Sequence, residues 1–144
     1  MDVATLTAAQ ARELRQAVLR PNVPFEQNIY PGDDDPASLH VGLYDDGVLV
    51  AVGSMLNQPP QGEADPAAWR LRGMAVAEKY RNRGLGARVL EICIAYASES
   101  GGSYMWCNAR AAARTFYERA GFLAEGDPFE VAASGPHYIM RKIL

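Results

Sequence analysis

The residues that most clearly indicate a chemistry lie where a predicted strand gives way to a predicted helix. There Arg81, Gly84 and Gly86 follow the pattern Arg-x-x-Gly-x-Gly. A glycine-bearing turn that opens a helix leaves the first helical N–H groups without intrahelical partners, and the helix dipole adds partial positive charge at the same place. Phosphate oxygens are suitable partners for such groups. The pattern predicts an anion site, although a plain helix-opening turn is the alternative because so short a match also arises by chance.

The side chains around this turn favour the anion site. Gly84 and Gly86 have no side chains, so a phosphate can approach the backbone closely at these positions. The flanking Arg81 and Arg83 can add charge-assisted contacts. Arginine is also the main basic residue type of the whole chain, with twelve Arg against two Lys. Arginine binds phosphate or carboxylate in a bidentate manner, which suits an anionic ligand, but codon usage explains the same excess equally well.

Periodicity and capping signals predict the elements that position this turn. A strand is expected over about 69–77 and a helix over about 84–98, whose apolar residues form one broad stripe. Earlier in the chain, Thr7-x-x-Gln10 has the capping-box pattern and opens a helix over about 8–19. In the chain, the strand-turn-helix unit therefore comes after a first helix and after the strands that follow that helix.

The remaining segments add further strands and one more helix. Two strands joined at Asp45-Asp46-Gly47 form a predicted hairpin that starts near Ser38. After the central helix we expect a strand over 103–109, a helix over 111–120 that stops at Gly121, a strand over 122–131, a turn at Gly135-Pro136 and a terminal strand. The order predicts a mixed α/β (α+β) fold in which residues 1–144 form a single domain.

Composition excludes several classes of protein. The net charge of -3 disfavours a nucleic-acid partner, and ordinary proportions of hydrophobic (49%) and charged (22%) residues indicate a globular protein. Cys93 and Cys107 lie in apolar runs without metal-ligand spacing, so we expect buried, reduced thiols and no metal site. Because the first residues lack a basic segment and a long apolar run, and no later segment approaches roughly 20 apolar residues, neither a signal peptide nor a membrane span is expected. A cytoplasmic protein without a membrane partner is expected.

Motifs downstream of the turn complete a pattern that resembles a known family. These motifs are Cys107-Asn108-Ala109-Arg110 and Phe116-Tyr117-Glu118-Arg119-Ala120-Gly121-Phe122. With the Arg81–Gly86 turn they make the chain resemble the GNAT superfamily of acyl-CoA-dependent N-acyltransferases. The resemblance covers the last half of the chain by motif and the first half by element order. Phe129-Glu130 and Gly135–Met140 also resemble a subgroup of small bacterial GNAT proteins similar to ElaA.

The resemblance implies both a fold and an activity. The implied fold is a GNAT-like three-layer sandwich, with a mixed, mainly antiparallel sheet of about six or seven strands and helices on both faces. The implied activity is N-acetyltransfer from acetyl-CoA to a primary amine, by direct attack on the thioester. The alternative is a catalytically silent acyl-CoA-binding module that serves sensing or partner binding. Relatives are often dimers, so a homodimer is an option, although no self-complementary patch is visible in the sequence.

The resemblance further implies where acetyl-CoA lies. Its pantetheine arm would pair with the strand around Met74, Ala75 and Val76. The pyrophosphate would rest on the turn, which consists of Arg81, Asn82, Arg83, Gly84, Leu85, Gly86 and Ala87. Asn108 would bond the cofactor arm and Tyr117 would contact the sulfur. The Asn108-to-Tyr117 spacing is nine residues, about two more than in many relatives, so the position of Asn108 is less well defined than that of Tyr117.

Two catalytic side chains are expected. By resemblance, the backbone N–H near Met74 polarises the thioester carbonyl and Tyr117 protonates the departing sulfur. Without the resemblance, Tyr117 would be taken for a packed aromatic beside Phe116. His137 is the expected general base, because the unperturbed pKa of histidine lies near neutrality. The alternatives are His40, Glu130 and a water relay, and a lone histidine on a strand often has only a structural role.

The acceptor amine is the least defined part of the prediction. In this architecture the acceptor site is formed by the first helix, the loop after it and the C-terminal strands. The candidates there are Arg15, Arg20, Phe25, Tyr30, Arg72, Arg110 and Tyr138. Convergence of several of these arginines would indicate an acidic or carboxylate-bearing amine.

Overall fold

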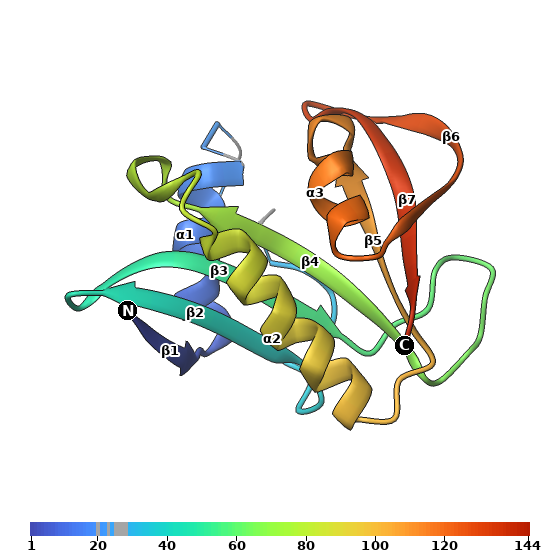
Figure 1. Ribbon diagram of the computed structural model, residues 1–144, viewed down its shortest axis with the longest axis horizontal. Coiled ribbons are helices and arrows are strands. Elements are labelled where there is room, and N and C mark those ends of the chain that lie inside the picture. The colour runs from blue at the N-terminus through green and yellow to red at the C-terminus, as the bar shows by residue number, and fades with distance from the viewer. Residues whose placement is uncertain (20, 23, 25–28) are drawn as a thin grey trace.

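A seven-stranded mixed sheet runs through the part of the chain that the structure describes (Figure 1). The structure is a computed structural model, and it describes residues 1–144 except 20, 23 and 25–28. The strands are β1 (Asp2–Thr5), β2 (Leu39–Asp45), β3 (Val48–Leu56), β4 (Ala68–Val76), β5 (Tyr104–Arg110), β6 (Leu123–Val131) and β7 (Gly135–Ile143). Their order is β1-β2-β3-β4-β5-β7-β6, and only β4 and β5 are parallel neighbours.

Helices cover both faces of this sheet, as Figure 1 shows for α1 and α2. The helices are α1 (Ala8–Leu19), α2 (Leu85–Glu99) and α3 (Arg114–Arg119). On one face Ala11 of α1 packs with Val52 and Ala75, and on the other Val89 of α2 packs with Ala51. Because successive strand residues point to opposite faces, Ala51 and Val52 reach different layers. The predicted mixed α/β three-layer fold is confirmed.

The ends of the elements follow from local chemistry. Thr7 N–H donates to Gln10 Oε1 at 2.8 Å and Gln10 N–H donates to Thr7 Oγ1 at 3.2 Å, which is the predicted capping box. In the β2–β3 hairpin, Asp46 and Gly47 have φ values of 48° and 81°, as a two-residue primed turn requires. Among the described residues, no helix is long and apolar enough to cross a membrane.

Three expectations about the elements are wrong in detail. Strand β1 was not expected, and it pairs with β2 at the edge of the sheet. The helix expected over 111–120 begins as a 3-10 turn, Ala111–Ala113, before α3. The turn expected at Gly135-Pro136 lies instead at residues 132–134, where Ala133 has a φ of 64°. Pro136 can sit inside β7 because it pairs only with Glu130 of β6, beyond the last β5 pair.

Strand β4 contains a bulge at its centre. Val52 of β3 pairs with Ala75 and Ser54 pairs with Arg72, so one residue of β3 between these pairs lies opposite two of β4. The extra residue is accommodated at Gly73, whose φ is 67°. A left-handed glycine in a bulge bends its strand and disrupts the hydrogen-bond ladder locally. β4 therefore changes direction in the middle of the sheet.

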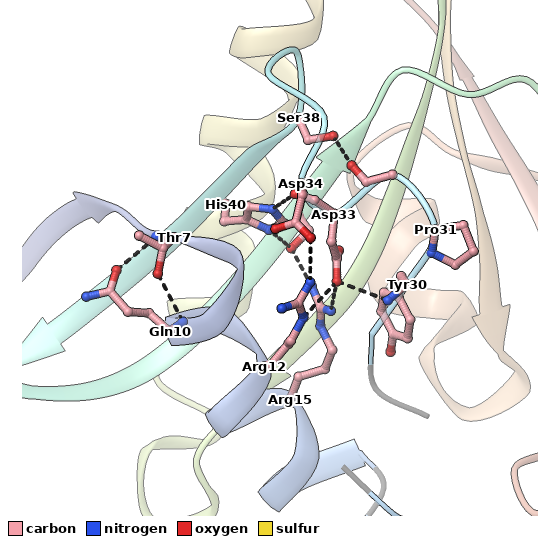
Figure 2. A network of polar contacts seen from close by, with 12 residues as sticks. Thr7, Gln10, Arg12, Arg15, Tyr30, Pro31, Asp33, Asp34, Ser38 and His40 are labelled. Carbon is pink, nitrogen blue, oxygen red and sulfur yellow. Dashed lines mark hydrogen bonds and ion pairs between the residues drawn. The ribbon is translucent and has the colours of Figure 1, made fainter. Parts of the chain in front are cut away.

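A buried polar network packs against the bulge (Figure 2). Arg15 of α1 is fully buried and donates to Asp33 Oδ2 at 3.0 Å and to Ser54 Oγ at 2.9 Å. A Cβ on Gly73 would lie 2.6 Å from Arg15 Nε, so glycine is needed there for space as well as for its φ. His40 closes the network, with Nδ1 2.6 Å from Ser54 Oγ and Nε2 2.8 Å from the Asp33 carbonyl oxygen.

Asp33 is the anion that balances this network. Burial disfavours its charged form, but the hydrogen bond and positive charge of Arg15 outweigh burial and lower the pKa of Asp33 below its usual value. The stabilisation by ionised Asp33 is therefore present above the usual aspartate pKa, and is lost as the pH falls through the lowered value. Arg12 also contacts Asp33, at 3.3 Å.

Replacing Asp33 with Asn should destabilise the protein strongly. The change leaves the fully buried Arg15 without its counter-charge, which typically costs about 3 to 5 kcal/mol. Asp34→Asn is the matched control, because Asp34 is 82% exposed and contacts Arg12 only at 3.4 Å. Its expected effect is within about 0.5 kcal/mol. Urea unfolding at neutral pH measures both, and equal losses for the two variants would contradict the role of Asp33.

Candidate functional site

A wedge opens between β4 and β5, the parallel pair of the sheet. The two strands pair only from Ala68–Tyr104 to Arg70–Trp106. Beyond this point β4 stays with β3 as far as Val76, whereas β5 stays with β7 up to its pair with His137. Figure 1 shows β4 diverging from the layer formed by β5, β7 and α3. The bulge at Gly73 lies on the diverging part of β4 and accounts for the change of direction.

A cavity of about 220 Å³ occupies the wedge. Four predicted site residues from four elements line it, namely Met74 of β4, Asn108 of β5, Tyr117 of α3 and His137 of β7. Its wall also includes Leu19 at the end of α1. Because α1 and α3 lie on opposite faces of the sheet, the cavity reaches both faces. Residues distant in sequence thus meet where the sheet is split.

Tyr117 presents a neutral hydroxyl to the cavity. Its ring is buried and packs edge-on against Phe116 and Phe122, with centroids 5.0 and 5.6 Å away. Burial raises the pKa of Tyr117 well above its usual value. No hydrogen-bond partner of the hydroxyl is found among the described residues. The group therefore keeps its proton at neutral pH and can donate it to an anion that forms in the cavity.

His137 is held with one ring nitrogen fixed. Its Nδ1 lies 2.9 Å from the carbonyl oxygen of Gly135, and its ring packs beside Phe129. A carbonyl can only accept, so Nδ1 carries the proton of the neutral ring and Nε2 is the basic nitrogen. His137 lines the cavity. A neutral imidazole with an available Nε2 has the form that a general base needs.

The other predicted bases lie elsewhere. His40 is buried in the Arg15 network, where Nε2 donates to the Asp33 carbonyl and Nδ1 accepts from Ser54 Oγ. Both of its ring nitrogens are thus engaged, which makes it a structural histidine. Glu130 is exposed on β6 and is not part of the cavity wall. Of the side chains considered as bases, the structure brings only His137 to the cavity.

Both cysteines are buried and free, as expected. Cys107 lines the cavity, and burial raises its pKa to about 12. Cys93, on the buried face of α2, has its pKa raised to about 12 for the same reason. A thiol is nucleophilic as its thiolate, so neither group is an activated nucleophile at neutral pH.

A larger groove of about 1260 Å³ lies at the start of α2. Gly84 is the N-cap of this helix, with a φ of 76° and no side-chain capping hydrogen bond. The first N–H groups of α2 thus have no intrahelical acceptor and no capping side chain. The predicted turn residues that line the groove are Arg81, Asn82, Gly84, Leu85, Gly86 and Ala87, joined by Val76. A Cβ on Gly86 would lie 3.4 Å from Phe116, so larger side chains there would extend into the groove.

Two of the predicted cofactor residues do not line the groove or the cavity. Ala75 is buried and packs with Val52 in the core beneath α1, because the bulge and the alternation of β4 turn it to that face. Arg83 lies over the ring of Tyr80, 5.1 Å from its centroid. Their side chains are therefore not part of these surfaces.

The groove and the cavity adjoin one another. Arg110 and Ala113 line both of them, at the end of β5 and the start of the segment that leads into α3. An elongated ligand can therefore place an anionic part at the start of α2 and its other end beside Tyr117. This arrangement suits a phosphate-bearing carrier of a reactive group.

The expected acceptor residues divide into two groups. Tyr30, Arg72 and Arg110 line the cavity, but Arg15 belongs to the buried network. Tyr138 is outside the cavity wall and lies under the guanidinium of Arg114, which is 4.7 Å from its ring centroid. Arg20 and Phe25 lie outside the described residues.

Arg70 is a cavity residue that sequence reasoning missed. It alternates with Trp69 and Leu71, which face the core under α2, so Arg70 and Arg72 share the other face of β4. Period-two alternation could have placed the two arginines together. What it could not show is that the sheet opens beside them.

Comparisons with known proteins give a consistent result. Residues 6–122 match the sequence model of the acetyltransferase (GNAT) family. The chain is 33% identical over 144 residues, which is 100% of this chain and 97% of the relative, to a Bacillus subtilis (strain 168) protein named uncharacterized N-acetyltransferase YitI.

Solved structures share the fold. An acyl-CoA N-acyltransferase from Pseudomonas aeruginosa superimposes with a TM-score of 0.78 at 22% identity, over 99% of both chains. Escherichia coli ElaA superimposes with a TM-score of 0.80 at 20% identity, over 98% of both chains. At these identities the similarity concerns the fold alone.

Proposed function

The chain belongs to the acetyltransferase (GNAT) family and is an acyl-CoA-dependent N-acyltransferase, and we propose that its reaction takes place in the wedge between β4 and β5. There the acetyl group of acetyl-CoA would pass directly to a primary amine. The observation that carries this proposal is that the groove at the start of α2 and the cavity that holds Tyr117 and His137 share Arg110 and Ala113 in their walls.

The groove would hold the phosphate end of acetyl-CoA. The N–H groups of Leu85, Gly86 and Ala87 are donors without intrahelical partners, and the dipole of α2 favours an anion beside them. Arg81 and Asn82 line the same groove. Arg83 would act through long-range charge from its position over Tyr80. The arrangement of these N–H donors and side chains supports the pyrophosphate position expected from the sequence.

The wedge would hold the thioester arm. Beyond Arg70 the edge of β4 is not paired with β5, so Met74, Ala75 and Val76 can offer backbone groups to an extended ligand. Asn108 is exposed on the opposite side of the wedge and lines the cavity, where it can bond the arm. Ala75 would contribute only its backbone, because its side chain faces α1.

The proposed reaction uses each group once. The amine nitrogen attacks the thioester carbon, and the N–H of Met74 stabilises the negative charge that forms on the carbonyl oxygen. His137 Nε2 takes the proton that the amine loses, directly or through one water molecule. The C–S bond breaks, and Tyr117 donates its proton to the departing sulfur. The products are an N-acetylated amine and free CoA.

Direct transfer is favoured over a covalent acyl-enzyme. Cys107 is the thiol that lines the cavity, and its raised pKa keeps it protonated at neutral pH. A silent acyl-CoA-binding module is the second candidate, and it would need neither a neutral Tyr117 hydroxyl nor a basic His137 nitrogen at the end of the arm. Release of free thiol from acetyl-CoA in the presence of amines distinguishes the two.

Three wider expectations belong to the same proposal. Residues 1–144 would act as one domain, since a continuous sheet joins the described strands. The cytoplasm is the proposed location, because both cysteines are free thiols and reducing conditions preserve them. A homodimer stays an untested expectation.

Gly86→Asp should weaken CoA binding without weakening the fold. A carboxylate in the first turn of α2 interacts favourably with the helix dipole and stabilises the helix by roughly 0.3 to 1 kcal/mol. The same carboxylate repels a pyrophosphate bound at these N–H groups. We expect an unchanged or higher Tm and roughly tenfold weaker CoA binding by calorimetry. Gly86→Asn, of similar size but uncharged, should lose much less affinity. Equal losses for Asp and Asn would contradict an anion site at this turn.

Tyr117→Phe should lower kcat by about 10²- to 10⁴-fold, the usual contribution of a positioned acid. The ring contacts with Phe116 and Phe122 remain, so stability and CoA affinity should change little. Tyr96→Phe is the control, since that hydroxyl donates to the Ala37 carbonyl away from the cavity. Retention of full kcat by Tyr117→Phe would remove the residue from the acid role.

His137→Asn should abolish the acidic limb of the pH profile of kcat/KM. Asn retains a donor close to the position of Nδ1, and so can keep the contact with the Gly135 carbonyl, but it has no counterpart of Nε2. Wild-type activity should fall at low pH because protonation removes the base, whereas the low activity of the variant should not follow that titration. An unchanged acidic limb in the variant would assign the base elsewhere.

A further inference from the structure

The turn that leads into α2 is not held in place by packing of its own side chains. All four residues of the segment 81–84 are exposed. Two of them, Asn82 and Gly84, have φ values of 63° and 76°, in the left-handed region that few residue types adopt readily. Exposed segments with few packing contacts open easily, so the shape of this turn depends on anchors at its ends.

One anchor is a hydrogen bond between the turn and the β2–β3 hairpin. The Tyr80 hydroxyl donates to Asp45 Oδ2 at 2.6 Å. Tyr80 ends the 3-10 turn Glu78–Tyr80, directly before the segment 81–84, and its ring packs against the hydrophobic core. The hydrogen bond raises the pKa of Tyr80 above its usual value, so the hydroxyl remains a donor at neutral pH. A bond to a carboxylate is stronger than one between neutral groups, and it joins the start of the turn to the end of β2.

Tyr80 also holds a charged side chain of the turn. The guanidinium of Arg83 lies over the Tyr80 ring, 5.1 Å from its centroid. Tyr80 lines the groove at the start of α2, and Arg83 does not, so the Tyr80 ring sets where the charge of Arg83 lies beside the groove. Arg81 has a separate anchor, because its Nε donates to the Val76 carbonyl oxygen at 3.3 Å.

Asp45 is an unexpected residue beside a phosphate site. A carboxylate near bound phosphates repels them, so Coulomb interactions alone favour a neutral residue at this position. The neighbouring Asp46 is also close enough for its charge to raise the pKa of Tyr80, but no hydrogen bond links it to the turn among the described residues. The presence of Asp45 is explained if its hydrogen bond to Tyr80 aids phosphate binding more than its charge opposes it.

We propose that Asp45 is a positioning residue for cofactor binding, which acts through the Tyr80 hydroxyl to hold the segment 81–84 in the conformation that receives the phosphate end of acetyl-CoA. This inference rests on the proposed pyrophosphate position at the start of α2. Neither Asp45 nor Tyr80 lines the cavity that holds Tyr117 and His137. The effect of the hydrogen bond therefore falls on cofactor affinity and leaves the chemical step unchanged.

Removing either partner of the hydrogen bond tests the proposal. Tyr80→Phe deletes the hydroxyl and keeps the ring under Arg83, and Asp45→Ala deletes the acceptor. Each change should weaken CoA binding by about 3- to 10-fold in calorimetry, because part of a charge-assisted hydrogen bond is lost. The double variant should lose no more than either single variant, since both remove the same interaction. The kcat at saturating acetyl-CoA should not change.

Charge and hydrogen bonding make opposite predictions for Asp45. Asp46→Asn is the matched control, because it removes the neighbouring charge and asparagine tolerates the φ of 48° at that position. It should leave CoA affinity unchanged or slightly higher. Asp45→Asn keeps an oxygen that can accept from Tyr80, and should retain most of the affinity that Asp45→Ala loses. If Asp45→Ala binds CoA as tightly as Asp46→Asn does, the hydrogen bond has no role in cofactor binding and the inference is overturned.

A truncated donor separates this inference from the proposed function and from a loss of stability. S-acetylpantetheine has the same thioester arm and no phosphates. The wild type should have a higher kcat/KM with acetyl-CoA, and Tyr80→Phe and Asp45→Ala should lower only that value. An equal loss with both donors would show a merely structural role and overturn the inference. A wild type that does not distinguish the donors would contradict the proposed phosphate site, and the inference with it. A wild-type preference that both variants retain in full would overturn the inference alone.

Discussion

The parting of β4 and β5 after Arg70 is the constraint on which the candidate site depends. A parallel pair inside a sheet would normally continue, and here the bulge at Gly73 turns β4 away while β5 stays with β7. Glycine at the bulge leaves the space that the side chain of Arg15 fills, and the buried Arg15 is paired with Asp33. The buried ion pair of Arg15 and Asp33 is thus coupled to the geometry of the opening in the sheet. The pair therefore helps to shape the site in addition to its effect on stability.

Because of the opening, each face of the sheet can contribute the binding surface for a different ligand. From the face of α2 and α3 comes a groove with unsatisfied helix N–H groups, suited to the phosphates of acetyl-CoA. From the face of α1 comes Tyr30, packed against Arg72 of the cavity wall. The proposed chemistry lies where they meet, between Tyr117 and His137. The fold keeps Tyr117 neutral by burial and fixes the histidine tautomer through Gly135.

Much of this arrangement could be predicted from local sequence signals, and the rest depends on distant pairing. The capping box at Thr7 and the Asp46-Gly47 turn act within a few residues, so α1 and the β2–β3 hairpin were predictable. Strand β1 is too short to show a period, and only its pairing with β2 defines it. That Arg70 lines the cavity depends on where β4 and β5 separate, which no local pattern records. The family resemblance indicated a site role for Tyr117. Without the resemblance, Tyr117 would be interpreted as a packed aromatic residue.

The central claim is that the wedge receives the thioester arm with its sulfur beside Tyr117. A crystal structure with a non-hydrolysable acetyl-CoA analogue tests it most directly. We expect the pyrophosphate at the N–H groups of Leu85 to Ala87, the pantetheine between β4 and β5, and the sulfur in hydrogen-bonding contact with the Tyr117 hydroxyl. A cofactor bound along another surface, or an arm that leaves the sulfur remote from Tyr117, would contradict it.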